Sequence, residues 1–289
     1  MTVAVAVLGP GGVGGALAVW LSEAGVRVIA VARPETAAAI ATEGLTLEHP
    51  LGTLRARPAA VERLEEPVDL LLVTVKAPAL GDALDRVAAA PRAVLPLLNG
   101  LEHMETIGAR FGNRVAAGSI GRFEAYRRGP ARIVQTTPGA VVALASSRLS
   151  REELERTGTI LGNARIEVRI GESEQQVLWE KLARLAPLAA LTAATQRTIG
   201  ELRFDPRLGA AIEEACRVAA ADGATGVTPE AQWEIIDGMA DSLTTSTARD
   251  VAAGRPSELD AIAGGVVRAG RRLGVPCPVL EELLDRCRA

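Results

Sequence analysis

Two lysines are the residues of this sequence that point most clearly to chemistry. The chain contains 32 basic residues, and only Lys76 and Lys181 among them are lysines. Arginine is effectively never deprotonated in a protein, whereas a partly buried lysine can shift its pKa and pass on a proton. A chain that uses arginine for nearly every positive charge is therefore expected to need an amine at these two positions. The alternative is that a compositional bias spared two lysines by chance.

A glycine-rich segment near the N-terminus has the spacing of a dinucleotide-binding turn. The segment 9–14 reads G-P-G-G-V-G, follows the apolar run 3–8 and precedes an amphipathic stretch that ends near Gly25. The first glycine permits a tight turn, the second lets the backbone approach a pyrophosphate and the third allows a helix to pack closely on the strand. The helix N-terminus that follows attracts phosphate. The predicted cofactor-binding residues are Gly9, Gly11, Gly12, Val13 and Gly14.

The end of the second predicted strand indicates which cofactor the turn binds. Val26 to Ala32 is the second apolar run, and Arg33 follows it directly. A carboxylate at this place hydrogen-bonds the ribose hydroxyl of NAD, whereas an arginine suits the 2′-phosphate of NADP. The sequence therefore favours NADP. The alternative is that Arg33 is an ordinary solvated residue before the next helix.

Lys76 and Asn99 each follow a predicted buried strand. The strands are the largely apolar runs Asp69 to Val75 and Ala93 to Leu98. Ligands of an open α/β sheet bind just beyond the carboxyl ends of its strands. We therefore expect Lys76 and Asn99 at the same edge as the glycine-rich turn, although each could also belong to a plain turn.

The remaining pattern predicts an α/β first half and an all-helical second half. The first half adds a hairpin (45–48 and 53–57), helices (35–42 and 79–90), an antiparallel addition to the sheet by two strands around Pro138-Gly139 (132–136 and 140–145), a capped helix (150–161) and a last strand (166–170). The second half contains only helical periodicity: 175–194 with Pro187 inside, 208–221, a helix that starts at Thr228-Pro229, 257–273, and a helix from Pro278. The predicted domains are an NADP-binding Rossmann-type domain, 1–171, and a helical substrate and catalytic domain, 172–289.

Composition excludes several functional classes. A net charge of −3 without blocks of like charge makes nucleic acid or an anionic membrane an improbable partner, and aromatic residues, at 2%, are too few for base stacking. No apolar run approaches the roughly 20 residues of a membrane helix, and the N-terminus lacks the features of a signal peptide. Three cysteines without C-x-x-C spacing favour neither a disulfide framework nor a zinc site. We expect a cytoplasmic protein that binds no metal.

Reduction of a carbonyl by a nicotinamide cofactor needs a proton donor for the developing alkoxide. The chain has only two histidines, His49 in the predicted hairpin and His103 at the start of a helix, and both are expected to be structural or solvated. Lys181 is the remaining candidate. Desolvation would lower its pKa towards neutrality, which is the condition for efficient acid catalysis.

Taken together and in order, these motifs resemble those of the ketopantoate reductase family. The resemblance covers essentially the whole chain and rests on the segment 9–14, Val75-Lys76-Ala77, Leu98-Asn99-Gly100, Trp179-Glu180-Lys181-Leu182, Ser246-x-x-x-Asp250, and the run from Arg255-Pro256-Ser257-Glu258-Leu259-Asp260 through Gly274-Val275-Pro276. It implies an NADP-binding Rossmann domain followed by a helical domain like that of 6-phosphogluconate dehydrogenase. It also implies reduction of 2-dehydropantoate, a small 2-oxo acid, to pantoate on the route to pantothenate and coenzyme A.

The resemblance further implies a role for each matching residue. Lys181 would be the general acid, and Glu258 its polar partner at the substrate. The other residues would bind ligands: Ser246 the substrate carboxylate, Arg33 the 2′-phosphate, and Lys76 and Asn99 the nicotinamide and the substrate. For Glu258 and Ser246, helix capping or a solvated helix face is the alternative.

Four positions depart from the family's pattern. Where the family has asparagines, this chain has Leu185, Ala189, Ile199 and Leu243. The first two lie four and eight residues after Lys181, on the same helix face. A site without those donors cannot bind the hydroxyl group of ketopantoate in the family's way. The polar residues that could compensate are Arg184, Thr192 and Gln196.

Three interpretations therefore stay open. The first is a ketopantoate reductase, and the second is a paralogue that reduces a more apolar 2-oxo acid. The third is a non-catalytic NADP-binding sensor, against which the retention of Lys76, Lys181 and Glu258 argues. A homodimer formed through the helical domain also stays open.

Overall fold

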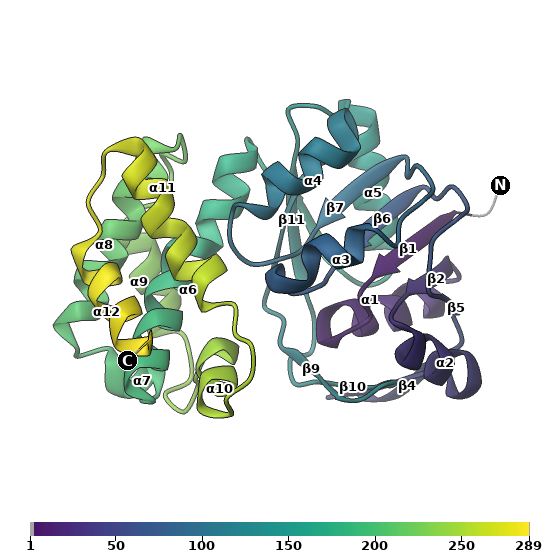
Figure 1. The fold of residues 1–289 in the computed structure, drawn as a ribbon, viewed down its shortest axis with the longest axis horizontal. Helices are drawn as coiled ribbons and strands as arrows, with labels where there is room; N and C mark the ends of the chain where they lie inside the picture. Colours follow the sequence, from purple (N-terminus) through teal and green to yellow (C-terminus); the bar gives the residue numbers. More distant parts are fainter. Residues whose placement is uncertain (1–2, 289) are drawn as a thin grey trace. The chain divides into compact units, whose positions relative to one another are not determined.

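The computed structural model describes residues 3–288 and divides into two compact units, labelled by element in Figure 1. The α/β unit consists of residues 3–98 and 103–174, and the helical unit of residues 99–102 and 175–288. The chain therefore changes unit after Glu174 and also makes a short excursion at 99–102. This excursion brings Asn99, which the sequence pattern placed in the first domain, into the helical unit.

A five-stranded parallel sheet forms the centre of the α/β unit. Its strands are ordered β5-β2-β1-β6-β7, with bounds Ala59–Val61, Arg27–Val31, Ala4–Leu8, Leu70–Val73 and Ala93–Pro96. Every residue of β1 is buried, because alternate side chains enter two separate cores. Val5 and Val7 lie in one core, and Ala6 and Leu8 in the other. Burial on both faces is the reason that these strands read as unbroken apolar runs.

Helices cover both faces of this sheet. Residues of α1 (Gly12–Glu23), α2 (Pro34–Glu43) and α5 (Arg151–Gly162) pack into the core that contains Val5 and Val7. Residues of α3 (Leu80–Leu84) and α4 (His103–Phe111) pack into the other. Two short 3₁₀ turns, Ala77–Ala79 and Gly112–Arg114, connect neighbouring elements. The predicted Rossmann-type fold is thereby confirmed.

Two smaller sheets extend the α/β unit. One is ordered β12-β11-β8 (Glu167–Ile170, Val141–Ala145, Ala117–Gly121), and the other β4-β3-β10-β9 (Gly52–Ala56, Leu45–His49, Arg132–Gln135, Ala125–Gly129). The backbone N–H of Ala116, just before β8, donates to the Val94 carbonyl of β7 at 3.0 Å, which continues the central sheet. The predicted hairpin of β3 and β4 is confirmed, as is the capping box that opens α5 at Ser150.

Two predictions about this unit need correction. The antiparallel addition expected around Pro138-Gly139 is correct for β11, which pairs antiparallel with β8, whereas β10 joins a separate sheet with β3 and β9. The helix expected over 79–90 ends at Leu84. Beyond it the backbone bonds to a neighbouring strand-like segment instead, with Leu64 N donating to Arg86 O at 2.7 Å and Ala88 N to Leu64 O at 2.9 Å. These tertiary hydrogen bonds override the helical preference of an alanine-rich stretch.

The helical unit is built around α6. Its helices are α6 (Glu174–Thr195), α7 (Ile199–Leu202), α8 (Pro206–Ala221), α9 (Pro229–Asp237), α10 (Ser246–Ala252), α11 (Gly265–Leu273) and α12 (Pro278–Arg288). From Leu182 to Ala193 most residues of α6 are buried, and Pro187 lies inside the helix as predicted. Thr228 caps α9 with Pro229 in the first turn, also as predicted. An α/β unit followed by a helical one is the fold class that the sequence predicts.

A π-helical turn, Asp260–Gly264, precedes α11. The sequence predicts one continuous α-helix over 257–273, so this turn was missed. It ends where Gly265 begins regular α-helix, and Gly274, with φ of +72°, terminates the helix as expected. Such turns are rare and are often found at functional sites. This one directly follows Leu259 and lies two residues after Glu258.

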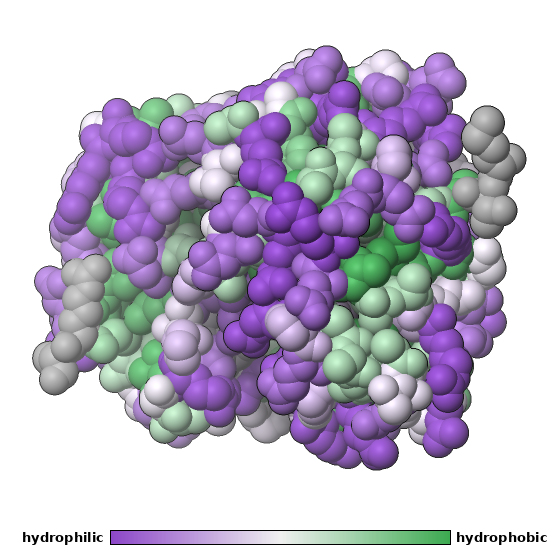
Figure 2. Space-filling view, turned by 45° about the vertical axis from the view of Figure 1, so that its right-hand side comes forward, coloured by the Kyte–Doolittle hydropathy of each residue, from purple (hydrophilic) through white to green (hydrophobic). Residues whose placement is uncertain are grey.

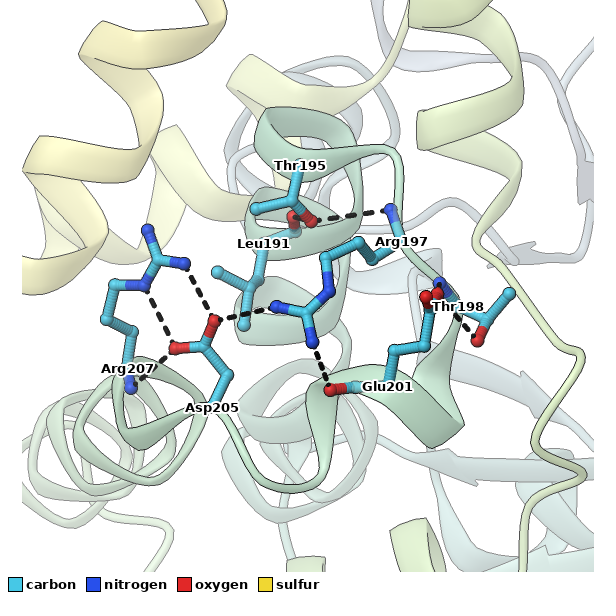
Figure 3. Close-up of polar contacts among 7 residues, drawn as sticks. All are labelled: Leu191, Thr195, Arg197, Thr198, Glu201, Asp205 and Arg207. Carbon is cyan, nitrogen blue, oxygen red and sulfur yellow. Dashed lines mark hydrogen bonds and ion pairs between the residues drawn. The ribbon is translucent and has the colours of Figure 1, made fainter.

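The carboxylate of Asp205 holds the junction between α6, α7 and α8. Figure 3 shows it between two guanidinium groups: Arg207 Nη2 donates at 2.7 Å and Arg197 Nη1 at 3.3 Å. Asp205 also caps α8, because it accepts from the backbone N–H of Arg207 at 3.1 Å. Arg197 in turn reaches the Glu201 carbonyl at 2.6 Å. The hydrogen bond from the Arg207 side chain, helped by the charge of Arg197, lowers the pKa of Asp205 to about 2.

No helix among residues 3–288 combines the length and the apolar character that crossing a bilayer requires. The face drawn in Figure 2 is mostly hydrophilic, with hydrophobic residues gathered in smaller areas between. The most exposed large apolar side chains are Phe204 and Leu51, at 89% and 80%. Single exposed apolar side chains are ordinary on a protein surface.

We expect Asp205→Asn to lower the free energy of unfolding by about 2 kcal/mol at pH 7, since a pKa that is depressed in the folded state stabilises that state. The pKa of Asp205 is about 2 in the folded state against an ordinary 3.8, so the stabilisation is present above pH 4 and is lost as pH falls towards 2. Urea unfolding of wild type and variant at pH 7 and pH 3 measures the difference. An equal difference at both pH values contradicts this role.

Candidate active site

The orientation of α6 determines where Lys181 points. Trp179 is fully buried, and its indole N–H donates at 2.8 Å to the carboxylate of Asp222, which caps the C-terminus of α8. Leu182 is also buried in the core of the helical unit. These two residues fix the rotation of the helix about its axis. The side chain of Lys181, which lies between them in sequence, is partly buried and reaches the segment Asn99–Glu102.

One amide group connects the Lys181 amine with the Glu258 carboxylate. Lys181 Nζ donates to Asn99 Oδ1 at 2.8 Å, and Asn99 Nδ2 donates to Glu258 Oε2 at 3.4 Å. An amide can do both at once, because its oxygen accepts while its nitrogen donates. The structure thus brings together three residues that the sequence singled out. Lys181 and Asn99 are 82 positions apart in the chain, and Asn99 and Glu258 are 159 positions apart.

Asn99 is held in the helical unit by the residues that follow it. Gly100 has φ of +93°, and a Cβ there would lie 2.4 Å from the carbonyl oxygen of Ala261. Only glycine meets both demands without strain. Leu101 packs against the apolar core of the helical unit. The Asn-Gly sequence after β7 is therefore more than a plain turn, because its glycine permits the backbone approach that places the Asn99 amide.

Burial lowers the pKa of Lys181 from the ordinary 10.5 to about 8. The neighbouring guanidinium of Arg184 lowers this pKa further, and the carboxylate of Glu258 opposes the change. At neutral pH such an amine is still protonated but releases its proton more readily than an ordinary lysine. That combination suits a general acid.

Arg184 is fixed in place beside this amine. Its Nη1 donates to the backbone carbonyl of Glu180 and to Oε1 of Gln232, the latter at 3.2 Å. Gln232 is itself buried. The sequence suggested Arg184 only as a substitute for the missing asparagines. The structure shows that it contributes positive charge close to Lys181.

The face of α6 beyond Lys181 is apolar. Leu185 is partly buried and Ala189 fully buried, and both belong to the core of the helical unit. Thr192 does not replace the hydrogen-bonding groups of the missing asparagines. It is buried, and its hydroxyl already lies 2.7 Å from Thr245 Oγ1 and 2.6 Å from the carbonyl oxygen of Leu188. The polar lining that the family's asparagines would provide is therefore not restored by Thr192.

Ser246 is exposed at the first position of α10. The residue that caps this helix is its neighbour Thr245, whose hydroxyl accepts from the backbone N–H of Ala248 at 3.1 Å. The capping role that the sequence left open for Ser246 thus belongs to Thr245. Ser246 is not part of the group formed by Lys181, Asn99 and Glu258.

The glycine-rich turn of the α/β unit has the geometry of a phosphate cradle. Gly9 has φ of +86°, and a Cβ at Gly14 would lie 2.2 Å from Thr74 Oγ1. At Gly11 a Cβ would meet only the carbonyl oxygen of Gly9, at 3.9 Å, so the backbone there faces open space. Helix α1 begins at Gly12, which directs unpaired N–H groups towards this space. These residues fit the pyrophosphate of a dinucleotide.

Thr74 supports this turn and was missed by sequence reasoning. Its hydroxyl lies 3.0 Å from the carbonyl oxygen of Leu8 and 2.9 Å from that of Gly9. A threonine inside an otherwise apolar buried strand segment was the signal that could have found it, because a buried hydroxyl needs a partner.

Arg33 and Lys76 lie at the same edge of the sheet as the turn. The backbone N–H of Gly9 donates to the Val31 carbonyl at 3.0 Å, two residues before Arg33. A Cβ at Gly9 would lie 2.4 Å from Val75, the neighbour of Lys76. Both side chains are exposed. Within the α/β unit, the strand ends therefore converge as the sequence predicts.

The two histidines have structural surroundings. His49 makes an edge-on contact with Trp20, with ring centroids 5.7 Å apart. His103 is buried, and burial lowers its pKa to about 4, so it is neutral at physiological pH. A neutral imidazole of this pKa is a poor proton donor for reduction near neutrality. Among residues 3–288, no group of three or more His, Cys, Asp and Glu side chains could hold a metal ion.

Two family models match this chain in the order of its two units. The model "Ketopantoate reductase PanE/ApbA" matches residues 5–146, and the model of its C-terminal domain matches residues 174–289. The chain belongs to the ketopantoate reductase family. It is therefore an oxidoreductase, as the sequence predicts.

Several known proteins resemble the chain over nearly its whole length. The 2-dehydropantoate 2-reductase of Vibrio cholerae is 30% identical, over 98% of this chain and 96% of that protein. The structure of 2-dehydropantoate 2-reductase from Geobacter metallireducens superposes with a TM-score of 0.89 at 22% identity, over 99% of both chains. A D-mandelate dehydrogenase solved with NADH and anilino(oxo)acetate has a TM-score of 0.87 at 19% identity, over 99% of this chain and 97% of that one. The two structural similarities concern the fold.

Lys181 is expected to titrate well below an ordinary lysine. Since the chain has only two lysines, protein labelled with ¹³Cε-lysine should give two lysine signals in an NMR titration. We expect one of them to report a pKa of about 8 and to vanish in Lys181→Arg, in which only the Lys76 signal remains. A Lys181 signal that titrates at 10.5 would contradict the desolvation of its amine.

Proposed function

We propose that this protein is an NADPH-dependent 2-oxo acid reductase and that its substrate is 2-dehydropantoate, which it reduces to pantoate in pantothenate biosynthesis. The observation that carries the proposal is the amine of Lys181, held by Asn99 next to Glu258, with a pKa of about 8. Membership of the ketopantoate reductase family and the similarity to 2-dehydropantoate 2-reductases support the substrate.

Lys181 supplies the proton in the proposed reaction. Bound NADPH would supply the hydride for the carbonyl carbon of the 2-oxo acid and would thereby become NADP⁺. The Lys181 ammonium donates its proton to the carbonyl oxygen, which becomes the hydroxyl group, and is left as the neutral amine. Asn99 orients the amine through its Oδ1. The nearby charge of Glu258 favours the ammonium form that the next turnover needs.

The remaining residues bind the ligands in this proposal. The segment 9–14 and the start of α1 hold the pyrophosphate, and Arg33 binds the 2′-phosphate. Lys76 and Asn99 contact the nicotinamide and the substrate. The exposed hydroxyl of Ser246 is available to hydrogen-bond the substrate carboxylate.

A second candidate is a paralogue that reduces a more apolar 2-oxo acid. The observation that favours it is the apolar face of α6, where Leu185 and Ala189 follow Lys181. Such a face suits an apolar substituent better than the hydroxyl group of ketopantoate. The D-mandelate dehydrogenase of similar fold was solved with anilino(oxo)acetate, an oxo acid derivative that carries a phenyl group.

Both candidates are tested by one panel of 2-oxo acids assayed with NADPH. We expect turnover of 2-dehydropantoate that falls by about 10³-fold or more in Lys181→Arg, because a guanidinium keeps the charge but does not release a proton. For wild type, kcat for reduction should decrease above about pH 8, where Lys181 loses its proton.

The panel distinguishes the candidates by kcat/KM. A higher value for a branched or aromatic 2-oxo acid than for 2-dehydropantoate would favour the second candidate. Full activity in Lys181→Arg would refute the role of this amine for either substrate. Tight NADPH binding without turnover of any 2-oxo acid would refute both.

Arg33 is expected to decide the choice between the two nicotinamide cofactors. Because a hydrogen-bonded charge pair contributes about 1.5–3 kcal/mol, Arg33→Ala should raise KM for NADPH about tenfold or more. KM for NADH should change little, since NADH lacks the 2′-phosphate. Steady-state kinetics with both cofactors measures this. An equal effect on the two values contradicts the assignment.

A further inference from the structure

The guanidinium of Arg268 ties the segment Asn99–Glu102 to the π-helical turn. Arg268 of α11 donates from Nε to Glu102 Oε1 and from Nη2 to Glu102 Oε2, both at 2.7 Å. It also donates to Asp260, from Nη1 to Oδ1 at 3.1 Å and from Nη2 to the carbonyl oxygen at 3.0 Å. The planar fork of arginine matches this two-pronged arrangement, which a lysine could not reproduce.

Two glycines provide the space that this arrangement needs. A Cβ at Gly264 would lie 2.9 Å from Asp260 Oδ1 and 3.0 Å from Arg268 Nη1. At Gly100, as described above, the loop backbone approaches the Ala261 carbonyl too closely for any side chain. The segment therefore lies against the π-helical turn at Gly100 and is joined to it through Arg268 at Glu102, one and three residues after Asn99.

The same π-helical turn follows Glu258, the second partner of the Asn99 amide. The backbone N–H of Ile262 donates to the Glu258 carbonyl at 2.9 Å, which joins Glu258 to the turn. A shift of the segment relative to the turn would therefore alter the distance from Asn99 to Glu258. That hydrogen bond is already long, at 3.4 Å, so a small shift would break it.

We propose that Glu102 and Arg268 are positioning residues, which hold the Asn99 amide between Lys181 and Glu258. The kinetic part of this inference rests on the proposed function, because it takes Lys181 as the proton donor. The hydrogen bond from Arg268 lowers the pKa of Glu102, so the pair remains ionised at neutral pH.

The partial exposure of the pair separates positioning from stability. The side chains of Arg268 and Glu102 are 36% and 40% exposed, and ion pairs at such exposure contribute little to the free energy of unfolding. A displacement of about 1 Å at an active site can nevertheless reduce the rate about 100-fold. Loss of the pair should therefore lower catalysis far more than stability.

Arg268→Met tests this inference, because it removes the guanidinium and keeps an unbranched side chain. We expect kcat to fall about tenfold, with KM for NADPH and Tm close to wild type. The matched control is Arg271→Met on the same helix, whose partner Glu281 lies 2.8 Å away. The control should retain wild-type kcat. Equal kcat values for the two variants overturn the inference, and so does a loss of kcat that only accompanies a lower Tm.

A double-mutant cycle with Asn99→Ala asks whether the pair acts through Asn99. In the Asn99→Ala background, Arg268→Met should cost little further kcat, because residues that act through one another are not additive. If each substitution instead reduces kcat by the same factor alone and in the double variant, Arg268 does not act through Asn99.

NMR of ¹³Cε-lysine-labelled protein tests the positioning role of Glu102 and Arg268 without any substrate. In ¹³Cε-lysine-labelled protein, the Lys181 signal should move in Arg268→Met in the same direction as in Asn99→Ala, and should keep its position in Arg271→Met. If wild type reduces no 2-oxo acid, the proposed function fails while this readout still judges the pair. An unmoved Lys181 signal in Arg268→Met overturns the positioning role.

Discussion

The geometry of the helical unit's candidate site depends on one amide group placed between an amine and a carboxylate. If Lys181 met Glu258 directly, the attraction of opposite charges would stabilise the ammonium and raise the pKa of Lys181. Asn99 hydrogen-bonds both groups instead, accepting from one and donating to the other. Desolvation then remains the dominant influence, with Arg184 adding to it, and the pKa of Lys181 is about 8. A neutral spacer thus preserves both the hydrogen bonds and the acidity of the amine.

Correct placement of this amide requires a backbone approach that ordinary residues forbid. Gly100 meets the Ala261 carbonyl in a π-helical turn, and Gly264 in that turn leaves room for Arg268 to bind Asp260. The extra residue of a π-helical turn shifts the helix out of α register, which explains why a plain helical pattern did not reveal it. Four residues that follow a strand of the α/β unit thereby become part of the helical unit.

Much of the fold was predictable from the sequence, because its signals are local. Buried parallel strands read as apolar runs, the capping box at Ser150 marked the start of α5, and Thr228-Pro229 marked the start of α9. The failures were non-local. β10 and β11 flank a Pro-Gly turn but belong to different sheets, and the stretch after Leu84 forms hydrogen bonds with Leu64 instead of extending its helix. Which elements pair there depends on packing across the whole unit, which the local sequence does not show.

By itself, the sequence determined the residue types that the chemistry requires. Two lysines among many arginines, a glycine-rich turn after a buried strand, and the order of the motifs pointed to an oxidoreductase of the ketopantoate reductase family. Only the tertiary structure decided that Asn99 joins Lys181 to Glu258, that Thr245 rather than Ser246 caps α10, and that Thr74 supports the glycine turn. The physical reason is that a hydrogen bond depends on distances of a few tenths of an ångström between side chains far apart in the chain, which packing sets and spacing in sequence does not.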